Sequence, residues 1–69
     1  MGKNMAEKMQ GREVIFEFRQ LGGIVRVSVM DVATMTEISI QGPASAGEEV
    51  LKYNALARLE YVLRKAEKL

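Results

Sequence analysis

Cysteine and histidine are both absent from the 69 residues of the chain. Without cysteine the chain forms no disulfide and no thiolate metal site, and without histidine it lacks the usual general base and imidazole ligand. Asp31 is the only aspartate, and the glutamates alternate with basic residues instead of converging as a pair suited to acid–base catalysis. We therefore expect a protein that is not an enzyme and that binds neither a metal nor a cofactor.

Long apolar runs are missing as well. No run approaches the roughly 20 residues of a membrane-spanning helix, and the opening MGKNMAEKMQ has neither the apolar centre nor the cleavage site of a signal peptide. We expect a cytoplasmic protein that does not associate with membranes.

Neither sign of charge dominates, because ten Lys and Arg face nine Asp and Glu and leave a net charge of +1. This balance is far from the strongly basic composition of an obvious nucleic-acid binder. A chain this short buries a small fraction of its surface on folding, and no disulfide adds stability. We therefore expect it to associate with itself, as a homodimer.

Three stretches alternate between apolar and polar residues, which is typical of half-buried β-strands. They are residues 12–20, 24–31 and 36–41. Residues 1–11 are instead polar with scattered methionines, which favours a flexible tail ahead of a single domain over residues 12–69. A short helix with Met5 and Met9 on one face is the alternative.

The glycine pair 22–23 suits a two-residue hairpin turn between the first two strands. That turn places Phe18 opposite Val27, so the apolar faces of the two strands coincide. A four-residue loop, which pairs Glu17 with Arg26, preserves the same faces and is the alternative.

From about residue 44 the apolar period becomes helical, and one stripe of the helix can lie across the strands. Its predicted members are Leu51, Ala55, Leu59, Val62 and Ala66, with Leu56 and Leu63 on the flank. We predict an α+β fold in the order βββα: a three-stranded antiparallel meander packed on one face by a long C-terminal helix.

The segment SIQGPASAGEEVLK, residues 39–52, has two glycines between strand and helix, as phosphate-binding loops do. Glu48 and Glu49 stand where such a loop needs a lysine and a hydroxyl, so a structural role is favoured. Ser45 to Glu48 match an S-x-x-E capping box, although Pro43 in the first turn is an alternative helix start.

Two surfaces are predicted to bind a partner chain. One is the edge of the first strand, whose apolar, β-prone residues are Val14, Ile15 and Phe16. The other is the helix face opposite the core stripe, with Val50, Ala57 and Tyr61 in line and Tyr53 at the border. Scattered surface apolar residues that need no partner are the plainer interpretation. These surfaces favour a small interaction or regulatory module that acts as a homo-oligomer on an unidentified protein partner.

Single-stranded nucleic acid is the alternative partner, because small sheets backed by a helix can bind it through basic grooves and exposed aromatic residues. The candidate contacts are Arg19, Arg26, Arg58, Arg64 and Lys65. This alternative is weakly supported, because Phe16 and Phe18 point into the predicted core.

The segments REVIFEFR, GPASAGE and LEYVL resemble a family of very short bacterial proteins of unknown function. The resemblance covers about residues 12–63 and implies a bacterial, cytoplasmic and uncharacterised protein, with no assigned functional residue. The family pattern has proline and glycine in the second turn, where this chain carries Val32 and Met35. That difference implies a positive φ at Met35, which is uncommon for a residue other than glycine.

Overall fold

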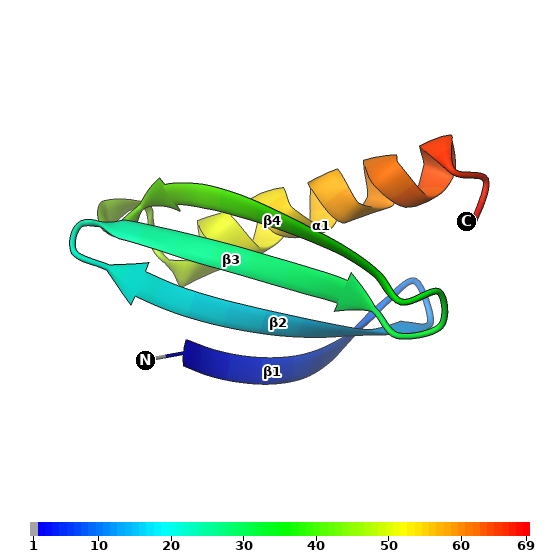
Figure 1. The fold of residues 1–69 in the computed structure, drawn as a ribbon, viewed down its shortest axis with the longest axis horizontal. Coiled ribbons are helices and arrows are strands. Elements are labelled where there is room, and N and C mark those ends of the chain that lie inside the picture. Colours follow the sequence, from blue (N-terminus) through cyan, green and yellow to red (C-terminus); the bar gives the residue numbers. More distant parts are fainter. Residues whose placement is uncertain (1) are drawn as a thin grey trace.

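The computed structural model describes residues 2–69, with side chains from Asn4 onward. Its strands form one four-stranded antiparallel sheet in the order β1-β2-β3-β4. A short 3-10 helix and one long α-helix follow, and the α-helix crosses one face of the sheet at a slant (Figure 1). The elements are β1 (Gly2–Met9), β2 (Arg12–Leu21), β3 (Ile24–Asp31), β4 (Thr36–Pro43), η1 (Ala44–Ala46) and α1 (Glu48–Lys65).

The sheet has four strands and not three, because the segment predicted to be a flexible tail is β1. This strand pairs with β2 from Gly2 opposite Arg19 to Met9 opposite Arg12. Residue 1 lies outside the described residues. The tail prediction failed because only Met5 and Met9 of β1 pack against the core, while Asn4, Ala6 and Lys8 on the other side of the strand are exposed.

The predicted register of β2 and β3 is confirmed. Phe18 lies opposite Val27, which lies opposite Ile40, so the apolar faces of β2, β3 and β4 are continuous. Arg19 lies opposite Arg26, as the two-residue turn requires, and the four-residue loop is therefore wrong.

The turn between β3 and β4 has the strain that the family resemblance implied. Met35 adopts a φ of 57°, a left-handed conformation that costs a residue with a side chain roughly 1–2 kcal/mol. Asp31 supports the turn, since its Oδ2 accepts a hydrogen bond of 3.2 Å from the backbone N–H of Thr34.

The core lies between the sheet and α1, which packs over β3 and β4. The helix buries Leu51, Ala55, Leu59 and Leu63. The predicted stripe is partly wrong, because Val62 is half-buried and Ala66 is exposed. Residues four apart rotate about 40° around a helix of 3.6 residues per turn, so the contact line drifts to Leu63 as α1 slants across the sheet (Figure 1).

The start of α1 differs from the predicted capping box. The cap position is Gly47, with φ 88° and ψ 151°, and no side chain caps the helix. Ser45 lies in η1 instead. Close packing fixes the chain reversal, because a Cβ on Gly42 would overlap the side chain of Leu51.

No helix in the described part of the chain is long and apolar enough to cross a membrane.

Candidate interaction surface

The outward side of α1 carries four apolar or aromatic residues that the sheet does not cover. Val50 and Tyr61 are each 52% exposed and Tyr53 is 72% exposed, and Ala57 is exposed between them. We call Val50, Tyr53, Ala57 and Tyr61 the outer stripe. The structure brings together all four residues predicted for this helix face, because a lone helix lying on a sheet buries only one of its sides.

Cations surround the aromatic ring at the C-terminal end of the outer stripe. The guanidinium carbon of Arg58 lies 5.4 Å from the centroid of the Tyr61 ring, and Lys65 Nζ lies 6.0 Å from it. Both distances are within the range of cation–π attraction. The N-terminal turn of α1 is acidic instead, with Glu48 and Glu49. The outer stripe therefore runs from an acidic end to a basic end.

The inward side of α1 is held to the sheet by polar contacts as well as by the core. Lys52 Nζ donates a hydrogen bond of 2.6 Å to Glu7 Oε2 on β1. Gln10 Nε2 donates one of 2.7 Å to Glu60 Oε2. These contacts tie both the first half and the second half of α1 to the β1–β2 hairpin, so the outer stripe sits on a rigid support.

The second predicted interface, the edge of β2, does not exist as an edge. Its backbone is paired with β1 on one side and with β3 on the other. Val14 and Phe16 are completely buried, and Ile15 is 36% exposed on the sheet face away from α1. The prediction was wrong because the strand that covers the β2 edge was read as a tail.

The free edges of the sheet belong to β1 and β4. The backbone N–H of Ala44 donates to Gly23 O at 2.8 Å, and backbone pairing alternates along an antiparallel ladder. The backbone groups of Glu37, Ser39 and Gln41 therefore face away from β3. Pro43, which has no N–H, ends this edge.

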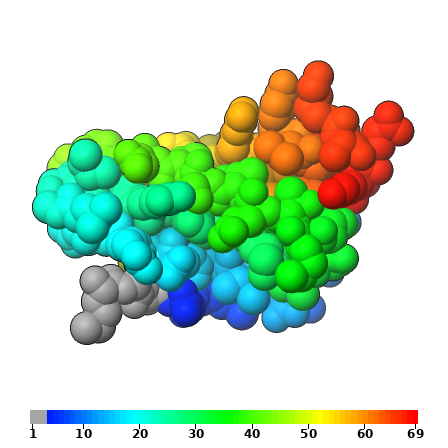
Figure 2. Space-filling view, viewed as in Figure 1, coloured from blue at the N-terminus to red at the C-terminus, as the bar shows by residue number. Residues whose placement is uncertain are grey.

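The five residues predicted to contact nucleic acid lie on two opposite sides of the molecule. Arg19 and Arg26 are neighbours on the open face of the sheet, the face turned to the viewer in Figures 1 and 2. They line a hollow of about 250 Å³ together with Glu17, Ser28, Glu37 and Ser39. Arg58, Arg64 and Lys65 lie on α1 in the other layer, so these five residues do not form one continuous basic groove.

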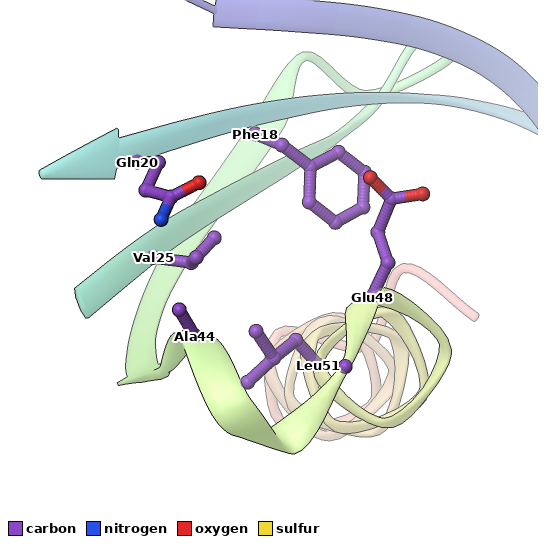
Figure 3. Close-up of a pocket in the computed structure, with 7 residues that line it drawn as sticks. Phe18, Gln20, Val25, Ala44, Glu48 and Leu51 are labelled. Carbon is purple, nitrogen blue, oxygen red and sulfur yellow. The ribbon is translucent and has the colours of Figure 1, made fainter. Parts of the chain in front are cut away.

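A second pocket, of about 290 Å³, opens where the start of α1 leaves the sheet (Figure 3). Its walls are Phe18, Gln20 and Val25 from the strands and Ala44, Gly47, Glu48 and Leu51 from the helical side. Gln20 Nε2 donates a hydrogen bond of 3.1 Å to the carbonyl oxygen of Gly22.

Among the described residues, no three carboxylates gather closely enough to hold a metal ion.

The one buried carboxylate of the described residues is fully engaged in structural contacts. Asp31 accepts hydrogen bonds from Arg12 Nε at 3.1 Å and from Arg12 Nη2 at 2.8 Å, and a third from Thr34 Oγ1 at 2.6 Å. The hydrogen bond from Arg12 is the largest cause that lowers the pKa of Asp31 to about 2, against the opposing effect of burial. Asp31 is therefore charged at neutral pH and anchors the β3–β4 turn to Arg12.

A family model for a domain of unknown function, DUF6898, matches residues 11–66. The match runs from the start of β2 almost to the end of the chain, so it includes the outer stripe and leaves β1 outside. No match was found among curated proteins or among solved structures. The resemblance to an uncharacterised domain family is thereby confirmed. Because the model spans most of its length, the chain belongs to the DUF6898 family of domains of unknown function.

Proposed function

We propose that the protein is a small non-enzymatic interaction module that acts as a homo-oligomer in the bacterial cytoplasm. The observation that carries this proposal is the outer stripe, where two tyrosines and a valine are each at least half exposed on one helix face. Contiguous apolar surface of this kind marks interaction sites in soluble proteins. A regulatory role follows if binding of a further protein partner depends on the oligomer.

The chemistry of the outer stripe supports a protein partner. Tyrosine and arginine are enriched among the residues that contribute most to protein–protein binding, and Tyr61 is flanked by Arg58. The support beneath the stripe is rigid, because α1 is anchored by four buried side chains on its other side. A preformed surface loses little conformational entropy on binding.

The test is the mass of the protein in solution, measured by light scattering after size exclusion over a series of micromolar concentrations. We expect a dimer for the natural chain and a folded monomer for Tyr61→Glu, because the new carboxylate would be buried in the interface. Met35→Glu is the matched control, since Met35 is a 70% exposed apolar residue in the β3–β4 turn and not in the outer stripe, and it should remain dimeric. A natural chain that is monomeric at every concentration would overturn the proposal.

Binding of single-stranded nucleic acid is a second candidate, favoured by the adjacent Arg19 and Arg26 on the open sheet face. Glu17 and Glu37 line the same hollow and oppose the binding of phosphates. Retention of a labelled oligonucleotide at low ionic strength tests this function, since phosphate contacts are strongest there. Retention that falls with added salt and with Arg26→Gln supports it, and failure to retain the oligonucleotide at low salt removes it.

A further inference from the structure

Three residues of the outer stripe, Tyr53, Ala57 and Tyr61, belong to a longer row of α1 whose chemistry is symmetrical about its centre. The row contains residues four apart, and all of them are exposed: Glu49, Tyr53, Ala57, Tyr61 and Lys65. Read in either direction, the row is a charged residue, a tyrosine, an alanine, a tyrosine and a charged residue. Only the sign of the terminal charge distinguishes the two directions.

This symmetry matches the requirement of a two-fold interface, in which the same surface patch is used by both subunits. In an antiparallel pair of α1 helices centred on Ala57, Tyr53 of one chain lies against Tyr61 of the second copy. Glu49 of one chain then lies near Lys65 of the second copy, so opposite charges meet at both ends. A parallel pair would instead bring each charged residue against its own like charge.

We propose that the occupant of the outer stripe is a second copy of this chain, bound by an antiparallel α1–α1 contact centred on Ala57. This inference rests on the proposed function and specifies its geometry. Rows of residues four apart are the ridges that interdigitate in the commonest class of helix packing, at a crossing angle of about −50°. Ala57 stands at the crossing point, where its small side chain allows the axes to approach to about 8–10 Å.

The acidic end of the row is available for such a contact. The Glu49 side chain is 86% exposed, and its intrachain ion pair with Lys52 spans 3.6 Å at the solvent boundary. The tyrosines supply the apolar contact, because aromatic side chains bury large areas and pair favourably when their rings are offset. Charge complementarity at the ends therefore selects the antiparallel orientation, and the tyrosines supply the contact area.

The absence of cysteine makes this geometry directly testable by single-cysteine crosslinking. The two copies of Ala57 face each other, and disulfides form when the Cα atoms are about 4.4–6.8 Å apart, so oxidised Ala57→Cys should become a covalent dimer. The two copies of Tyr53 are offset by about 12 Å at 1.5 Å per residue, so Tyr53→Cys alone should not crosslink. A mixture of Tyr53→Cys and Tyr61→Cys should yield the mixed dimer. Leu21→Cys, 60% exposed on the sheet, is the negative control.

Exchange of the terminal charges is a second test that leaves both tyrosines in place. Glu49→Lys alone, or Lys65→Glu alone, should weaken dimerisation about tenfold, because two attractive pairs at the rim become repulsive. The double variant restores opposite charges and should recover the natural dissociation constant. Thermal unfolding of each variant at low concentration verifies that the monomer is folded.

The outcomes separate this geometry from the broader proposal. A dimer that neither crosslinks at Ala57→Cys nor recovers in the charge-exchanged double variant overturns the antiparallel α1 contact and leaves the interaction function in place. A natural chain that remains monomeric overturns both. Equal crosslinking of Leu21→Cys and Ala57→Cys would indicate random collisions and also overturn the contact.

Discussion

The two sides of α1 carry similar residues at similar spacing, yet the fold uses them differently. The inner side places Leu51, Ala55, Leu59 and Leu63 against the sheet, where each is at most 3% exposed. The outer stripe leaves both of its tyrosines more than half exposed. An apolar helical period therefore predicts a face that can pack against another element. Contact with the sheet determines which of the two faces is buried within one chain. The other face stays in contact with solvent.

The largest expected difference between the two sides comes from removing one side chain from each. Leu59→Ala should lower the free energy of unfolding by about 2–5 kcal/mol, because Leu59 is completely buried and leaves a cavity. Tyr61→Ala should lower it by less than about 1 kcal/mol in the monomer, because half of the side chain is exposed and the variant loses only surface contacts with Arg58 and Lys65.

Urea denaturation at a protein concentration at which the chain is monomeric measures the change in unfolding free energy for both variants. A large loss for Tyr61→Ala under these conditions would mean that the outer stripe stabilises the monomer itself, and the contrast between the two sides of α1 would be lost.

A smaller effect is expected from the buried ion pair of Asp31 and Arg12, which makes the free energy of unfolding depend on pH in a way that exposed ion pairs do not. Arg12 lowers the pKa of Asp31 from 3.8 to about 2 in the folded protein. The stability that this ion pair supplies is therefore complete above about pH 4 and is lost as the pH falls towards 2. A difference of this size corresponds to roughly 2–3 kcal/mol. Urea denaturation at a series of pH values should show this decline.

Asp31→Asn should abolish this part of the decline, because an amide does not titrate. Glu17→Gln is the control, since its ion pair with Arg19 spans 3.6 Å between exposed side chains. An unaltered pH profile for Asp31→Asn would show that other carboxylates cause the acid sensitivity.

Most of the sheet could be predicted because the sequence carried two independent signals that agreed. The glycine turn at 22–23 and the alternation of apolar residues each place Phe18 opposite Val27, and the structure confirms that register. The outer stripe was also predictable, because its residues share one helix face whatever the helix packs on. Its exposure depended only on which side the core occupied.

The first strand could not be predicted, because an edge strand needs apolar residues on one side only and β1 has just two in the core, Met5 and Met9. Its turn also lacked the usual signal. Gln10 and Gly11 both adopt positive φ, at 52° and 80°, and glutamine is not among the residues that favour such turns. The missed strand then led to the wrong interface at Val14 and Phe16.

The smallest expected effect concerns the residues just before α1, which lie on neither its buried side nor the outer stripe. A side-chain cap at Ser45 would be worth about 1 kcal/mol, but the helix begins after Gly47 without one. Ser45→Ala should therefore change the free energy of unfolding by less than about 0.5 kcal/mol.

Gly47→Ala is the informative contrast, because φ 88° with ψ 151° is a conformation available almost only to glycine, at a cost of about 1–3 kcal/mol for other residues. Chemical denaturation of the two variants decides between the interpretations. If Ser45→Ala were the more damaging change, the helix would depend on a cap at Ser45. If Gly47→Ala is the more damaging, the backbone at Gly47 and the packing of Leu51 on Gly42 are sufficient to start α1.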